Sequence, residues 1–136
     1  MTAAELKYLI AISELYDGGA EVSLTAAAEK MQVTKASAHK SVMRLEQCGY
    51  IRHNEKNKII VTESGYERLE KYGMLIGWLT GHLQKNCHVS TDIAKNDAIG
   101  AVCAFSEESI QGLTSFIAST RFAGEKLPER NEKNDR

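Results

Sequence analysis

The sequence predicts a mainly α-helical fold that contains one small β-hairpin. Apolar residues recur at three- and four-residue intervals over most of the 136 residues, which is the helical period. Two short β-prone runs, 49–52 and 58–61, flank a polar turn and predict the hairpin. A long helical pattern begins directly after it. We expect a first domain at residues 1–62, a helical dimerisation segment at 63–122 and a flexible charged tail at 123–136.

Three helices are expected before the hairpin. The first, at residues 3–16, has its apolar side chains at helical spacing and is ended by the Asp-Gly-Gly sequence at 17–19. Ser23 and Thr34 are residue types that cap helix N-termini, and each opens a short apolar pattern. Only a tight turn separates these two patterns. The order of three helices followed by a hairpin predicts a winged helix-turn-helix with the hairpin as its wing. Glu21-Val22 can add a minimal third strand beside the hairpin.

The helix expected at residues 34–45 has one packing face and one cationic face. Its apolar stripe comprises Val33, Ala38, Val42 and Leu45, and three cations stand away from it, Lys35, Lys40 and Arg44. The whole chain has a net charge of −1, but residues 24–61 hold seven Lys or Arg against three Glu, a net +4. Three cations on a helix are more often an ordinary solvated face. The helix-turn-helix and wing around them favour binding of double-stranded DNA.

We expect the DNA-contacting side chains to come from this helix and from the wing. Hydroxyl and cationic side chains suit base edges and phosphates, respectively. His39 and His53 are interpreted as polar contacts on the phosphate side rather than as pH sensors. The expected DNA-binding residues are Thr34, Lys35, Ser37, His39, Lys40, Arg44, Arg52, Lys56 and Lys58.

The second half of the chain predicts a long helix from residue 63 to about residue 84, followed by two shorter ones that begin at Ser90 and Ser106. The long helix has a broad apolar stripe. Glycines recur in the long helix every four residues, at 73, 77 and 81. Two interpretations stay open: the glycines permit close packing against another helix, or they have no packing role. An apolar surplus on so small a segment predicts a partner, most simply a second copy in a homodimer.

Several classes of protein are disfavoured. No run of 18 apolar residues and no secretory signal pattern is present, which predicts a cytoplasmic protein without a membrane anchor. The three cysteines are widely spaced without a Cys-x-x-Cys pair, so neither a disulfide framework nor a zinc knuckle is expected. No paired carboxylates, nucleophile with a base, or phosphate-binding glycine loop stands out. The chain is not expected to be an enzyme.

The chain resembles the iron-dependent repressors, the group of the diphtheria toxin repressor and the manganese transport regulator. The resemblance covers residues 6–113, about four-fifths of the chain. It is carried by residues 24–29 (LTAAAE), 42–51 (VMRLEQCGYI), 61–65 (VTESG) and 105–108 (FSEE). The resemblance implies a homodimer that reads a palindromic operator, with Thr34, Ser37 and Lys40 toward base edges and the other expected contacts on phosphates.

The resemblance also implies a divalent metal such as manganese, iron or zinc, but most of the ligand positions are replaced. They fall on Lys7, Ile10, Gly73, Gly77, Lys95, Ile99, Val102 and Cys103. Only Cys103 keeps a donor, whereas such an ion needs about four to six. The usual metal site is therefore expected to be lost and no cofactor is assigned. A relocated site would have to use His82, Cys87, His88 and Cys103, whose spacing matches no ligand motif.

The sequence thus predicts a sequence-specific DNA-binding transcriptional regulator, a repressor, that lacks the usual metal site of the family it resembles. Two alternatives stay open. One is a metal-responsive repressor with the relocated site, and the other is a dimeric protein-interaction module that has lost DNA specificity.

Overall fold

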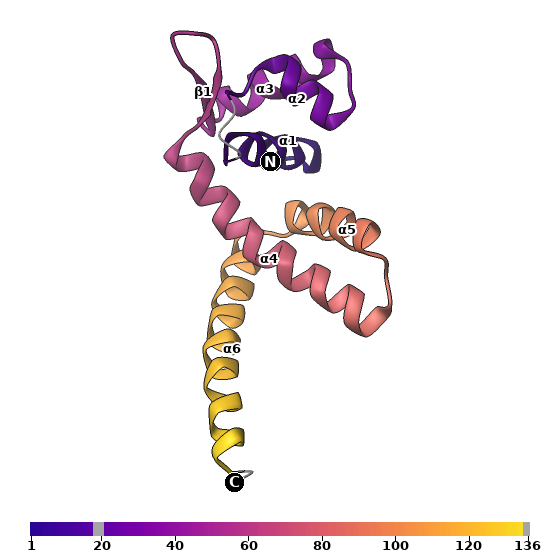
Figure 1. Ribbon diagram of the computed structural model, residues 1–136, viewed down its shortest axis with the longest axis vertical. Helices are drawn as coiled ribbons and strands as arrows, with labels where there is room; N and C mark the ends of the chain where they lie inside the picture. The colour runs from indigo at the N-terminus through magenta and orange to yellow at the C-terminus, as the bar shows by residue number, and fades with distance from the viewer. Residues whose placement is uncertain (18–20, 135–136) are drawn as a thin grey trace. The chain divides into compact units, whose positions relative to one another are not determined.

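A computed structural model describes the backbone of residues 1–17 and 21–134 and the side chains of residues 1–17 and 21–120 (Figure 1). The described part contains six helices and one two-stranded antiparallel sheet, which confirms the predicted fold class. The elements are α1 Ala3–Asp17, α2 Leu24–Met31, α3 Lys35–Gln47, β1 Ile51–His53, β2 Ile59–Val61, α4 Glu63–Cys87, α5 Thr91–Ala104 and α6 Glu107–Asn134. None of the helices, within the described ranges, is long and apolar enough to cross a membrane.

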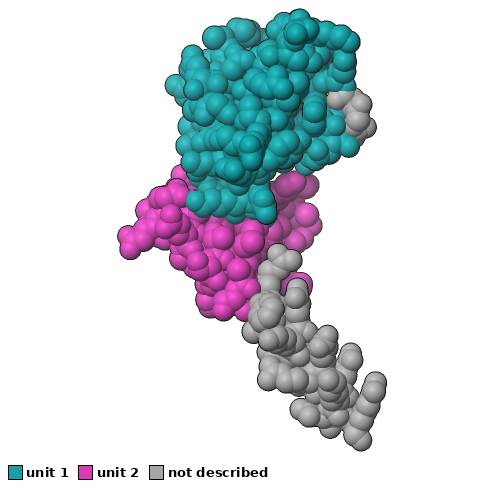
Figure 2. All heavy atoms as spheres, turned by 90° about the vertical axis from the view of Figure 1, so that its left-hand side faces the viewer, with its two compact units in different colours: residues 1–73 teal, residues 74–136 magenta. Residues whose placement is uncertain are grey.

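The chain divides into two compact units, residues 1–73 and 74–136, which Figure 2 colours teal and magenta. The first unit holds the three short helices, the hairpin and the start of α4. The second holds the rest of α4 with α5 and α6. Because α4 belongs to both units, the domain boundary predicted at residues 62/63 lies at the start of this helix.

The core of the first unit is formed where α1, α2, α3 and the hairpin meet. Its buried side chains come from all four, and include Leu9, Ile12, Ala27, Leu45 and Ile59. Burying an aliphatic side chain of this size contributes roughly 1.5–3 kcal/mol. This core holds α3 against the hairpin and leaves the opposite face of α3 in solvent.

Local hydrogen bonds explain where α2 and α3 begin. The Ser23 side chain accepts a hydrogen bond from the amide of Ala26 at 3.0 Å, and the Thr34 hydroxyl accepts one from the amide of Ser37 at 3.2 Å. Both predicted caps are therefore confirmed. Between the helices Gln32 adopts a left-handed conformation with φ 57°. Val33, expected on the packing stripe, is 39% exposed because it lies in this turn before the helix starts.

The hairpin pairs Ile51 with Val61 and His53 with Ile59, so His53 lies in a strand and not in the turn where the sequence placed it. The Asn54 side chain closes the turn by accepting hydrogen bonds from the amides of Lys56 and Lys58, both at 2.9 Å. The expected third strand is reduced to a bridge between Val22 and Ile59. Two residues are too few to extend a ladder.

Hydrogen bonds join the start of α4 to residues 49–50, which directly precede β1. The Thr62 hydroxyl donates to the carbonyl of Gly49 at 2.6 Å and accepts from the amide of Gly65 at 3.1 Å. The amide of Thr62 donates to the carbonyl of Tyr50 at 3.1 Å. The segment that leads into β1 and the start of α4 are thus connected through the Thr62 hydroxyl and backbone groups.

In the second unit, buried side chains from α4, α5 and α6 form the interior: Leu75, Ile76, Ala94, Ala98, Ile99, Val102, Ile110 and Ile117. Figure 1 shows α5 returning alongside the end of α4. The helix α4 continues past the expected end to Cys87, and Ser90, expected to cap α5, makes no side-chain cap bond. The helix α6 runs through Asn134, so the predicted tail coincides with its last part, whose side chains lie outside the described residues.

One tyrosine at the start of α4, Tyr66, is expected to make the stability of the first unit depend on pH in the alkaline range. Partial burial, followed by the nearby Asp17 carboxylate and Tyr16, raises the pKa of Tyr66 above its ordinary value of 10.0, and Asp17 also accepts its hydrogen bond. A raised folded-state pKa gives stability that is present below pH 10 and lost as the pH rises through the raised value.

We therefore expect the Tyr66→Phe variant to lose less stability than the wild type when the pH is raised from about 8 to about 11. Urea denaturation followed by circular dichroism at both pH values measures this. Equal alkaline losses in the two proteins would contradict the assignment.

Candidate nucleic-acid interface

The solvent face of α3 is the structural centre of the candidate interface. Its buried side chains are Ala38, Val42 and Leu45. Helical spacing places Ala36, Lys40, Met43 and Gln47 in a row on the opposite side, and all four are exposed. A helix that presents such a row beyond a packed face can enter a major groove.

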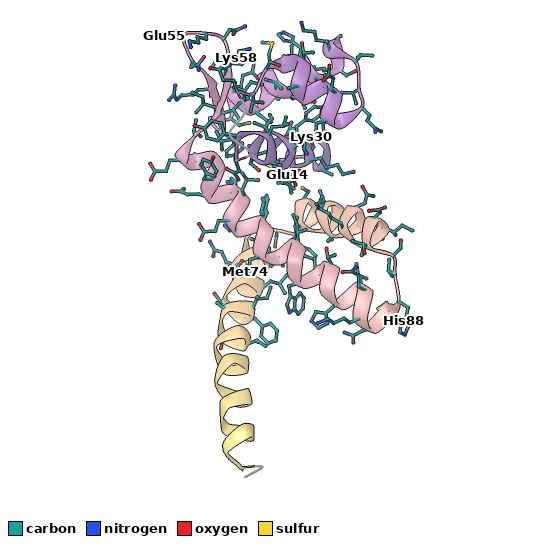
Figure 3. The ribbon with its side chains drawn as sticks, viewed as in Figure 1. Glu14, Lys30, Glu55, Lys58, Met74 and His88 are labelled. Carbon is teal, nitrogen blue, oxygen red and sulfur yellow. The ribbon has the colours of Figure 1, made fainter. Side chains whose placement is uncertain are left out.

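A groove of about 550 Å³ lies between this helix and the wing. Four of the expected DNA-binding residues line it, Lys35 and His39 from α3 and Lys56 and Lys58 from the wing. Figure 3 labels Lys58 on the hairpin, close to the turn that also carries Glu55. Three ammonium groups and two imidazoles, those of His39 and His53, therefore line the groove together with one carboxylate, that of Glu46. The excess of cationic groups suits a phosphate backbone.

The other five expected residues do not line this groove. Thr34 and Ser37 are joined at the N-terminus of α3, where the Thr34 hydroxyl donates to the Ser37 hydroxyl at 3.0 Å. Lys40 lies on the exposed row. Arg52 is exposed on β1, one residue before His53, and so points to the other face of the hairpin.

Arg44 is directed toward α1. Its guanidinium lies 3.4 Å from the Glu5 carboxylate, and 60% of the Arg44 side chain is exposed. Glu5 in turn accepts a hydrogen bond from the amide of Thr2. The Glu5 side chain is only 13% exposed, but the guanidinium of Arg44 is solvated. A solvated pair contributes about 1 kcal/mol, so Arg44 can exchange Glu5 for a phosphate at small cost.

Sequence reasoning missed one side-chain contact and two exposed residues. Glu46 of α3 and His53 of β1 line the groove and contact each other through Oε2 and Nδ1. Met43 and Gln47 stand in the exposed row with Lys40. The four- and three-residue spacing from Ala36 could have identified this row, but the Glu46–His53 contact depends on the fold of the hairpin.

The positions that carry metal ligands in the resembled family do not offer a site here. Ile99 and Val102 are buried apolar side chains, and at Gly73 and Gly77 an added Cβ would meet nothing within 4 Å. Over residues 1–17 and 21–120, no three His, Cys, Asp or Glu side chains form a group that could hold a metal ion. These residues therefore do not fit the divalent ion that the family implies.

The four candidates for a relocated site lie in the second unit without forming such a group. The Nδ1 atom of His82 is 2.9 Å from the Asn86 amide nitrogen, and its ring packs edge-on against Trp78 with centroids 4.5 Å apart. Cys87 and His88 are exposed at the end of α4, where Figure 3 labels His88, and Cys103 is half-buried in α5.

Comparison with known proteins agrees with this geometry. Residues 1–59 match the family model for the iron dependent repressor, N-terminal DNA binding domain. No curated protein sequence matches the chain significantly. The manganese regulator SloR is similar in structure, with a TM-score of 0.70 and 18% identity over 84% of this chain and 53% of the SloR chain.

Two further solved structures are similar at the same 18% identity. The metal-dependent transcriptional regulator MtsR has a TM-score of 0.70 over 87% of this chain and 55% of its own. The hypothetical protein SSo2273 from Sulfolobus solfataricus has a TM-score of 0.65 over 88% of this chain and 91% of its own. The chain thus spans about half the length of SloR and MtsR. Residues 1–59 of the chain thus match the N-terminal DNA-binding domain of the iron-dependent repressor family.

Proposed function

We propose that the protein is a transcriptional repressor that binds an operator as a homodimer without a regulatory metal. The observation that supports this most directly is the exposed face of α3 beside a groove lined by Lys35, Lys56 and Lys58. Two such faces in a two-fold dimer would enter successive major grooves of a palindromic site, about 34–36 Å apart. The protein would then act in the cytoplasm by occupying a promoter.

The roles of the side chains follow from their places on the helix and the wing. Lys40 is on the exposed row of α3 and would reach base edges, as would Thr34 and Ser37 at the start of the helix. The other six expected residues would contact phosphates and give the binding its salt dependence. They are Lys35, His39, Arg44, Arg52, Lys56 and Lys58.

The second unit would form the dimer. Large apolar side chains remain in solvent there, with Ile93 58% exposed, Phe116 56% and Phe105 37%. Phe116 lies edge-on to Trp78, with ring centroids 6.3 Å apart, so an aromatic surface is already ordered in one protomer. Association would remove this apolar surface from water.

The metal-independent part of the proposal rests on the residues at the ligand positions. A buried isoleucine, a buried valine and two glycines offer no donor atom, and the thiol of Cys103 alone cannot hold a divalent ion that needs about four to six donors. Binding to the operator would then be regulated by another effector or by the concentration of the protein.

The test is DNA binding by the purified protein, with operator sequences selected from a randomised duplex pool. Binding is measured by fluorescence anisotropy after chelation and again with manganese, iron(II) or zinc restored, alongside metal analysis of the protein as isolated. We expect equal affinity in every condition, a preferred sequence and a steep salt dependence.

Other outcomes separate the alternatives. Binding that appears only with metal would support the relocated site at His82, Cys87, His88 and Cys103, and loss of the response in a His82→Ala variant would identify it. A dimer that shows neither sequence preference nor salt dependence would instead favour the protein-interaction module.

A further inference from the structure

The pair formed by Glu46 and His53 connects the recognition helix to the wing inside the DNA-facing groove. Oε2 of Glu46 contacts Nδ1 of His53, and the two side chains are 44% and 27% exposed, respectively. Glu46 is in the last turn of α3 and His53 is the last residue of β1. The contact therefore joins α3 to β1 of the wing, the two elements that would lie on either side of one DNA strand.

The Glu46–His53 pair lies among mostly cationic side chains. The ionisable groups that line the groove are Lys35, His39 and Glu46 from α3, and His53, Lys56 and Lys58 from the wing. The start of α2 contributes Ser23, Leu24 and Thr25, which carry no charge. Among the described residues, Glu46 is the only carboxylate that lines this groove. Glu21, Arg52 and Glu55 line a second hollow together with His53, so two further carboxylates and a guanidinium lie near the imidazole.

Phosphates and the Glu46 carboxylate repel each other, and the strength of this repulsion depends on whether the His53 imidazole is neutral or cationic. Nδ1 of the imidazole can donate its proton to the carboxylate whether the ring is neutral or cationic, so the contact itself persists. Protonation at Nε2 adds one positive charge that offsets Glu46. An imidazole ordinarily changes charge near pH 6.5, within the physiological range.

The sequence favours a phosphate contact over a pH sensor at His53, but the contact with Glu46 changes this interpretation. We propose that Glu46 and His53 form a proton-linked contact that makes DNA binding by this protein stronger at lower pH. This inference rests on the proposed function. When a DNA strand occupies the groove, its phosphates favour the cationic ring, and His53 takes up a proton at Nε2. By linkage, a lower pH then favours the complex. Glu46 and His53 are positioning residues that hold the wing to α3, while the lysines contact the phosphates.

The test measures affinity for a mixed-sequence duplex of about 30 base pairs by fluorescence anisotropy, in roughly 0.05 M salt with chelator. We expect the wild type to bind roughly tenfold more tightly at pH about 6 than at pH about 8. Glu46→Gln keeps a hydrogen-bond acceptor and removes the negative charge that repels the phosphates, so it should bind more tightly than the wild type at the higher pH.

Substitutions of the histidine separate charge from structure. His53→Gln should lose at least half of the pH response and bind weakly throughout, whereas His53→Lys should lose the same share of the response but bind tightly. His39→Gln tests the other imidazole in the groove and should retain most of the response. His88→Asn, in the second unit and at a left-handed position that asparagine tolerates, serves as the matched control for loss of a histidine.

A direct readout comes from the imidazole proton signals of His53, followed by NMR with and without the duplex. We expect the ring to stay cationic to higher pH in the complex, and circular dichroism checks that each variant is folded. A wild-type response that survives intact in His53→Gln, or a pH-independent wild type, would overturn the inference while leaving the proposed function intact. A wild type that binds no duplex at any pH would overturn the proposed function itself.

Discussion

Replacing Gly65 by alanine is expected to destabilise the first unit by about 3 kcal/mol or more. A Cβ at this position would lie 2.2 Å from the carbonyl oxygen of Tyr50 and 2.9 Å from Cγ1 of Val61. Neither neighbour can move away freely. The Tyr50 carbonyl also accepts the hydrogen bond from the amide of Thr62 at 3.1 Å, and Val61 is buried in the core.

The substitution would therefore separate the wing from α4. Moving Tyr50 away from the new methyl group would break the bonds that join residues 49–50 to Thr62, which include the hydroxyl bond to the carbonyl of Gly49 at 2.6 Å. We expect a lower urea midpoint for Gly65→Ala, and weaker DNA binding even where the protein is folded, because the wing loses its orientation.

Gly73 supplies the matched control on the same helix. A Cβ there would meet nothing within 4 Å, so Gly73→Ala should stabilise α4 by up to about 1 kcal/mol through helix propensity. Urea denaturation followed by circular dichroism compares the two variants with the wild type. A Gly65→Ala protein as stable as the wild type would show that the close approach of Tyr50 imposes no constraint.

Features that depend on a few neighbouring residues could be predicted from the sequence. The caps at Ser23 and Thr34 each require a hydroxyl and an amide three residues apart, and helical spacing alone predicts the buried face of α3. The hairpin turn could also be predicted, because the Asn54 side chain closes it through hydrogen bonds to the nearby amides of Lys56 and Lys58.

Features that depend on how distant segments meet could not be predicted. Nothing near Gly65 in sequence shows that the carbonyl of Tyr50 approaches it. The contact between Glu46 and His53 requires the hairpin to fold back on α3, and a one-residue change of register would turn His53 to the other face. Arg44 was assigned correctly to the exposed part of α3, yet its contact with Glu5 belongs to the packing of α1.

Reversing two charges on α3 is expected to have the largest effect on DNA binding. Lys35 lines the groove beside the wing and Lys40 stands on the exposed row, so Lys35→Glu with Lys40→Glu removes one expected phosphate contact and one expected base contact in each protomer. Loss of the Lys40 contacts alone would cost a dimer roughly 2–6 kcal/mol, which is a loss of thirtyfold or more in affinity. The added carboxylates would repel the phosphates as well.

The salt dependence distinguishes contact with DNA from a general effect of net charge. Each cation removed from a phosphate should make the slope of log affinity against log salt shallower by about 0.9. Lys85→Glu with Lys95→Glu changes the net charge equally but alters exposed residues of α4 and α5 that belong to the second unit. This control should keep most of the affinity and of the slope. If both double variants lost affinity equally, the attraction would come from the charge of the whole protein, and α3 would not be the element that reads DNA.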